Sequence, residues 1–205
     1  MTVSHFGTAA EVDWETVEEV LAVVGRTPIL LSDVELATLV RLVDVEPLEA
    51  TGSHRSRILD ARIRLEIEFR DIEDSGLLLR LELDPQRARQ TLIERGGGEA
   101  ELFGQFDQHG LREADLDELA LRVAAVDAFV QQRLRPRISV NMDEIEAAYQ
   151  QLLVDEIATS DEPVPPLATV REQLHQLLVE RKLNDEIERW LARATERQEV
   201  LRFNR

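Results

Sequence analysis

The stretch Val20-Leu-Ala-Val-Val-Gly-Arg-Thr-Pro-Ile-Leu-Leu-Ser-Asp-Val-Glu35 decides how this chain begins to fold. Its first half is rich in β-branched residues and is interrupted by a Gly-Arg-Thr turn, which is typical of two short strands joined in a hairpin. Ser32 is followed three residues later by Glu35, the spacing of a helix capping box. The stretch therefore predicts a hairpin over 20–31 and a helix over 33–43.

The segment that follows is harder to interpret. Residues 46–57 contain Pro47 and Gly52 and are typical of a loop. Over the next fifteen or so residues, apolar side chains alternate with charges, as in a strand, but they also recur at helical spacing. We favour a helix over 54–72 followed by an extended segment over 77–83. The alternative is a hairpin formed by two strands in these regions.

The remainder of the chain is mostly helical in pattern. Asp84-Pro85 combines an N-cap with a proline in the first helical turn, and Gly96–Gly98 and Gly110 provide helix stops. A proline-rich acidic connector, 161–166, precedes the longest pattern, which at 1.5 Å per residue predicts a helix of about 45 Å. The predicted helices cover 85–95, 99–109, 113–134, a segment that starts at Asn141-x-x-Glu144, and 167–196.

Residues 199–203 form a plausible closing strand that lacks a local partner. We expect this strand to pair with the N-terminal hairpin and to bury Leu201 and Phe203. The predicted fold class is therefore mostly α (α+β), with a small antiparallel sheet and one long C-terminal helix. We expect a flexible acidic lead over 1–16 and one domain over 17–205.

The amino-acid composition argues against several classes of function. The 205 residues carry a net charge of −17, which argues against a nucleic-acid partner, and 43% of them are apolar, which suffices for a core. The absence of cysteine excludes disulfides and thiolate metal sites. No apolar run approaches the roughly 18 residues of a transmembrane helix, so we predict no membrane span.

No pattern indicates catalysis or a cofactor. The chain lacks the phosphate-loop, dinucleotide, serine-elbow and zinc-protease motifs, and its four histidines are far apart in sequence. Arg133, Arg135 and Arg137 could hold an anionic partner, but a helix C-terminus also favours cations, and we prefer that interpretation. We therefore predict no catalytic residue, no metal site, no cofactor and no enzymatic activity.

The order of these elements resembles that of the SurA-type periplasmic chaperones. The hairpin and capped helix over 20–35 resemble that family's opening, and Arg133–Tyr149 resembles the helix that precedes its isomerase domain. Leu167–Leu191 resembles the helix that follows that domain, and Val200–Phe203 resembles the last strand. The resemblance spans 17–205, apart from a middle at 44–110 that matches poorly.

One departure from the family is informative. Only 17 residues separate Tyr149 from Leu167, whereas a domain below about 40 residues rarely folds by itself. A parvulin-type prolyl isomerase domain cannot fit there. The resemblance thus implies a chaperone module without an isomerase domain, in the periplasm or otherwise exported.

That resemblance implies an ATP-independent holdase that binds extended apolar segments of unfolded exported or outer-membrane proteins. The alternative is a structural assembly subunit that docks on a dedicated partner or on a second copy of itself. A crevice between the helical lobe over 54–134 and the long helix would receive the client. The candidate peptide-binding residues are Phe103, Phe106, Leu111, Phe129 and Tyr149.

Overall fold

The computed structural model describes residues 18–43, 51–159 and 165–203. These residues form seven α-helices and a small three-stranded antiparallel sheet, which confirms the predicted fold class. The elements are β1 (Val20–Val24), β2 (Thr27–Leu30), α1 (Leu31–Leu39), α2 (Thr51–Asp74), α3 (Pro85–Arg95), α4 (Glu99–His109), α5 (Glu113–Phe129), α6 (Met142–Thr159), α7 (Leu167–Arg197) and β3 (Val200–Arg202).

The sheet brings the two ends of the described chain together. Its strand order is β2-β1-β3, and β1 pairs antiparallel with both neighbours. Gly25 takes a positive φ of 58° in the turn between β1 and β2, a conformation that favours glycine. The predicted hairpin and its pairing with the C-terminal strand are confirmed, although Leu201 and Phe203 are half exposed rather than buried.

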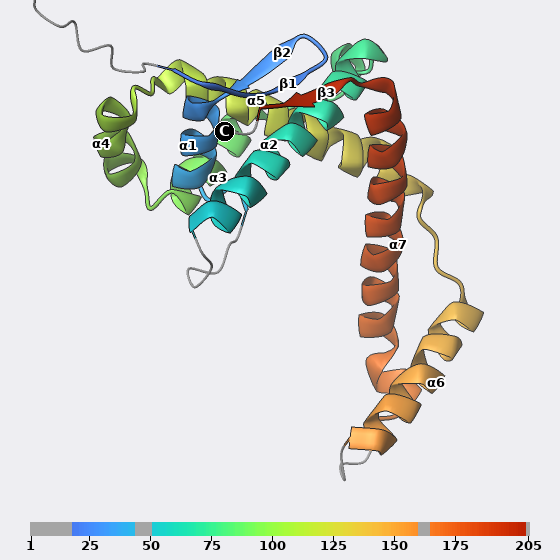
Figure 1. Cartoon of the computed structure of the whole chain (residues 1–205). Coiled ribbons are helices and arrows are strands. Elements are labelled where there is room, and N and C mark those ends of the chain that lie inside the picture. Colours follow the sequence, from blue (N-terminus) through green and yellow to red (C-terminus); the bar gives the residue numbers. More distant parts are fainter. Residues whose placement is uncertain (1–17, 44–50, 160–164, 204–205) are drawn as a thin grey trace, which may run out of the picture.

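Helices α1 to α5 and the sheet form a compact unit that we call the head (Figure 1). Helix α2 runs through its middle and is buried on several sides, with apolar residues packed toward α1 and the sheet and toward α3, α4 and α5. The hydrophobic core of the head divides into two large clusters and a third cluster beside α7. The largest fully buried side chains include Ile29, Ile72, Leu92, Leu102 and Leu116.

Helices α6 and α7 form an arm that projects from the head (Figure 1). The C-terminal half of α7 packs on the head, where Leu183, Trp190 and Ala194 are buried. The N-terminal half extends away and lies beside α6. Helix α6 begins with the predicted cap, since the Asn141 and Glu144 side chains each accept the other residue's backbone N–H at 2.9 Å.

The predicted capping box at Ser32 and Glu35 is wrong. Because β2 runs directly into α1, the helix starts at Leu31, and the Asp33 carboxylate accepts the Leu30 backbone N–H at 2.8 Å. Glu35 instead pairs with His109. The helix also ends at Leu39, four residues earlier than predicted, since Arg41 adopts a positive φ of 48°.

Three further boundaries differ from expectation. Helix α2 already begins at Thr51, inside the predicted loop over 46–57, and residues 77–83 contain a 3₁₀ turn, η1 (Leu78–Arg80), instead of an extended segment. The predicted helix 113–134 is α-helical only to Phe129. A π-helical turn, η2 (Val130–Leu134), follows it, and then a 3₁₀ turn, η3 (Arg135–Arg137), which contains Pro136. The predicted acidic lead over 1–16 and most of the proline-rich connector lie outside the described residues.

Candidate functional site

The joint between head and arm is built around Trp190 of α7. Its ring lies 4.4 Å from that of Phe129 on α5, measured between centroids. Its indole N–H donates to the Asp71 carboxylate of α2 at 2.8 Å, and Arg197 pairs with the same carboxylate. One aromatic contact and one shared carboxylate therefore tie α7 to two helices of the head.

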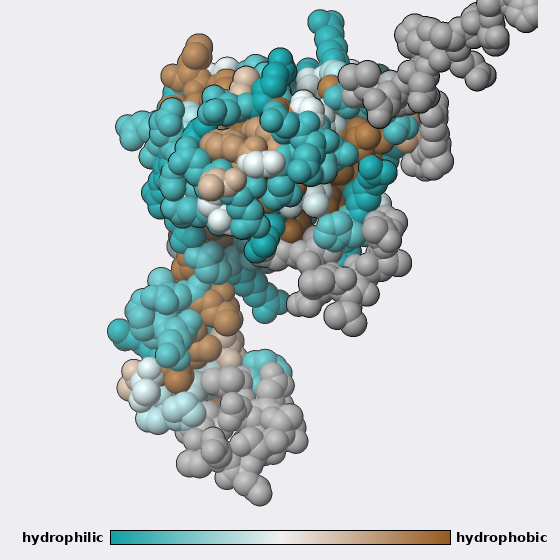
Figure 2. Space-filling view, turned by 90° about the vertical axis from the view of Figure 1, so that its left-hand side faces the viewer, coloured by the Kyte–Doolittle hydropathy of each residue, from teal (hydrophilic) through white to brown (hydrophobic). Residues whose placement is uncertain are grey.

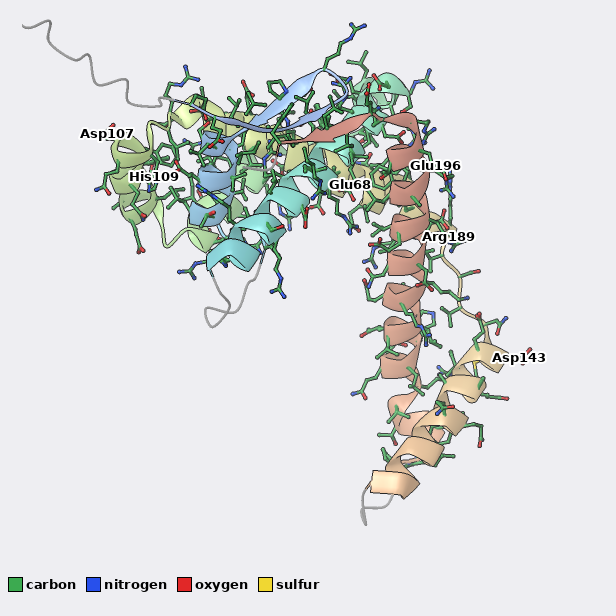
Figure 3. The ribbon with its side chains drawn as sticks, viewed as in Figure 1. Glu68, Asp107, His109, Asp143, Arg189 and Glu196 are labelled. Atoms are coloured by element: carbon green, nitrogen blue, oxygen red, sulfur yellow. The ribbon has the colours of Figure 1, made fainter. Side chains whose placement is uncertain are left out.

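A charged cluster lies in the angle beside this joint. Arg64 of α2 bonds Glu68 one turn along and also Glu188 of α7, each at 2.9 Å. Glu68 is almost fully buried, and this burial raises the pKa of its carboxyl even though Arg64 acts to lower it. Figure 3 shows Glu68 in the angle between α2 and the arm. The angle is therefore held by an ion-paired bridge.

Two more charged pairs lie inside the head. Arg122 of α5 donates to Glu66 of α2 at 2.8 Å and stands 5.2 Å from the centroid of the Phe69 ring. Arg62 reaches Asp33 of α1 at 3.5 Å, and burial lowers the pKa of its guanidinium. These pairs fix α2 against α1 and α5, and they explain how charged residues occur in a core helix.

Three of the predicted peptide-binding residues belong to the head core. Phe106 and Leu111 are buried in the cluster formed by α1 to α5, and Phe103 is partly buried against it. The Phe103 and Phe106 rings meet edge to face at 5.0 Å, and Arg89 lies over Phe103. In this conformation their main contacts are with other side chains of the head.

The other two predicted residues lie elsewhere. Phe129 is buried in the joint against Trp190, whereas Tyr149 is half-buried on α6 and donates its hydroxyl hydrogen to the Pro165 carbonyl at 2.9 Å. The structure thus brings Phe103, Phe106 and Leu111 together but places Phe129 and Tyr149 in two separate regions. The five residues do not line a common crevice.

One accessible apolar surface lies on the arm, although other exposed apolar side chains, such as Leu79 at 95%, lie on the head. Between Val170 and Leu183, no residue of α7 is buried, although this segment carries Leu174, Leu177 and Leu178. We call these three leucines the arm stripe; Leu177 is 61% exposed and the other two are half-buried. Figure 2 shows hydrophobic residues gathered along the arm among hydrophilic ones.

A second accessible apolar surface covers the outer face of the sheet. Leu201 and Phe203 are 49% and 51% exposed, and Leu201 lies opposite Val23, which also faces Pro28 of β2. This sheet face carries apolar side chains from all three strands. It lies on the head, away from the arm stripe.

Besides a groove of about 320 Å³ whose lining includes Arg62 and Leu111, the head has two larger grooves that the sequence did not predict. One of about 410 Å³ runs between α3 and α5, with Leu42, Leu92 and Val123 in its lining and charged residues such as Arg87 and Asp127 around them. The other, of about 460 Å³, is lined by residues from α1, α2 and α4, including both His54 and His109. No sequence spacing could have indicated that these two histidines line one groove, because α2 and α4 are brought together only by tertiary packing.

Within the described residues, no three His, Asp or Glu side chains are placed to hold one metal ion. None of their helices has the length and apolar character needed to cross a lipid bilayer.

No protein-family model matches the chain, and no curated protein is significantly similar to it in sequence.

Proposed function

We propose that this protein is an ATP-independent holdase that binds extended apolar segments of unfolded proteins. The observation that carries the proposal is the arm stripe on a helix that extends away from the head. Exposed apolar side chains beyond what packing requires are typical of interaction sites, and such surfaces discriminate little between ligands. The N-terminal half of α7 extends away from the head (Figure 1), and Leu177 is 61% exposed, so an extended segment could reach this stripe from solvent.

The order of the elements supports a SurA-like assignment. Along the chain, the N-terminal hairpin comes first, the two helices of the arm come later, and the last strand returns to pair with the hairpin. This is the order that the resemblance requires. The connection between α6 and α7, where that family carries its isomerase domain, is short. We therefore propose a chaperone module that has no prolyl isomerase activity and acts in the periplasm or after export.

The test is suppression of aggregation by the purified full chain. An unfolded outer-membrane protein is diluted from urea with and without the protein, and light scattering is followed in the absence of nucleotide. We expect suppression at near-stoichiometric ratios. Because the contact is apolar, suppression should persist in moderate salt, whereas attraction between charged groups is screened beyond a Debye length of roughly 8 Å.

The position of the client is tested by site-specific crosslinking. A photoreactive residue replaces Leu177 on the arm, and a matched control replaces Leu79, which is 95% exposed on the head. The holdase proposal expects client crosslinks from position 177 well above those from position 79. Equal crosslinking at both positions would show that the client does not bind preferentially at the arm stripe.

A different result would favour the assembly-subunit alternative. If the folded protein neither slows aggregation nor binds apolar peptides over a broad concentration range, the holdase proposal fails. One saturable interface with a single partner, or with a second copy, would then explain the exposed leucines. A proline-peptide assay showing catalysis well above background would contradict the expected lack of isomerase activity.

A further inference from the structure

A pocket of about 460 Å³ lies where the end of the head meets the arm. Its lining comes from η3 and the segment after it, represented by Arg137, Ile138 and Ser139, and from one side of α7, represented by Lys182, Glu186 and Arg189. Figure 3 shows Arg189 on the side of α7 along which the segment leading into α6 runs. The pocket is thus formed by two parts of the chain that are far apart in sequence.

The charge of this pocket contrasts with that of the chain. Three cations and one carboxylate line it, a net charge of +2, whereas the whole chain carries −17. Lys182 pairs with Glu144, and Glu186 is shared between Arg189 and Arg193. Including Glu144 and Arg193 therefore leaves the local net charge at +2.

The donors of the pocket are only partly used. Lys182 donates to the Ser139 carbonyl at 2.7 Å, and Arg189 donates to the Asp185 carbonyl at 3.1 Å and to Glu186 at 3.0 Å. The Arg137 side chain is exposed and makes no hydrogen bond or ion pair with any described residue. A guanidinium offers five N–H donors in a fork that matches an oxyanion.

We infer that this pocket binds a phosphate dianion, either inorganic phosphate or the phosphate group of a small phosphomonoester. Two negative charges match the net charge of the lining, and several phosphate oxygens can accept from donors on different sides. A carboxylate has one charge and two oxygens, so it can satisfy fewer of these donors. The inference concerns the joint between head and arm and does not depend on client binding at the arm stripe.

The test is a titration of the full chain with sodium phosphate at constant ionic strength, followed by amide NMR shifts. We expect saturable shifts confined to residues 137–139 and 182–189. Arg137→Gln and Arg189→Gln should each weaken binding about fivefold, the upper end of what an exposed charged contact contributes. Arg171→Gln, which removes an exposed charge from the same helix outside the pocket, is the control and should leave the affinity unchanged.

Two further titrants define the ligand. Tighter binding of glycerol 3-phosphate than of inorganic phosphate would identify a phosphomonoester as the ligand, and the reverse order would identify free phosphate. Acetate binding as tightly as phosphate would overturn the inference. So would equal phosphate affinity in the wild type, R137Q and R189Q, since the shifts would then reflect general ion effects.

Discussion

The head and the arm are both built from amphipathic helices, but they cover their apolar residues to different extents. In the head, α2 meets neighbours on several sides, and even Glu66 and Glu68 are nearly inaccessible. In the arm, α6 and the N-terminal half of α7 have mainly each other, and the arm stripe stays partly exposed. Helix α7 belongs to both regions, so the change occurs along one continuous helix.

This difference shows that burial depends on how many elements surround a helix, and only secondarily on its own pattern. Val179 and Leu183 lie about one turn apart on the same face of α7, yet Leu183 is buried and Val179 is only half-buried. Removing apolar surface from water contributes roughly 25 cal/mol per Å², so the head should hold most of the stability. The arm keeps apolar surface available for a ligand.

The largest effect is expected at the joint. Trp190→Ala removes a buried ring, its contact with Phe129 and a hydrogen bond to Asp71. Large-to-small changes of this type cost about 3–5 kcal/mol, which should appear as a large fall in the urea midpoint. A change below about 1 kcal/mol, comparable with a surface substitution, would show that the arm is not anchored through this residue.

A smaller effect is expected at the sheet. Deleting 199–205 removes β3, including the bond from the Gly25 N–H to the Glu199 carbonyl and the half-buried Val200. Leu201 and Phe203 contribute less than full burial would, because both are about half exposed. We expect a loss of about 2 kcal/mol from these hydrogen bonds and contacts. An unchanged denaturant midpoint would contradict the pairing of the chain ends.

The sequence predicted much of this architecture because local signals were strong. Asp84-Pro85, Gly110 and Asn141 mark helix ends through chemistry that needs no distant partner, and all three were confirmed. The ambiguity over 54–72 has a physical cause. Helix α2 is buried on several faces, so its apolar residues fit both periods. Its buried charges are compensated by Arg64 of the same helix and by Arg122 of α5.

The surfaces proposed to bind ligands were harder to predict from the sequence. Phe103, Phe106 and Phe129 are aromatic residues on helices, and sequence alone does not show how many neighbours cover the face that each of them occupies. Leu177 has no distinguishing sequence signal, because its spacing of three residues from Leu174 also separates Ile187 from Trp190 in the half of α7 that packs on the head. The phosphate pocket also depends on tertiary structure, which places Arg137 beside Lys182.

The buried carboxyl beside the joint should give a pH-dependent effect. Because burial raises the pKa of Glu68 above its ordinary value of 4.5, folding favours the protonated form. Its contribution to stability is fully present below the unfolded-state pKa and is lost as pH rises through the folded-state pKa. As the pH rises from 4.5 to neutrality, the free energy of unfolding of the Glu68→Gln variant should therefore fall less than that of the wild type. Parallel stability curves for both proteins, from urea titrations at several pH values, would contradict the raised pKa.

The smallest effect on stability is expected at Leu177, and it gives the sharpest test of the comparison between head and arm. Leu177→Ala shortens a side chain that is largely exposed, so the free energy of unfolding should change by no more than about 0.5 kcal/mol. Leu183→Ala makes the same chemical change on the same helix but at a buried position, where about 2–5 kcal/mol is expected.

The aggregation assay should give a different result for Leu177. Among folded proteins, L177A should suppress aggregation less well than the wild type, whereas L79A on the head should suppress it as well as the wild type. Urea midpoints for all three variants, measured beside the scattering assay, separate stability from binding. If L177A loses as much stability as L183A, another element covers the arm stripe, and that stripe is not free to receive a client.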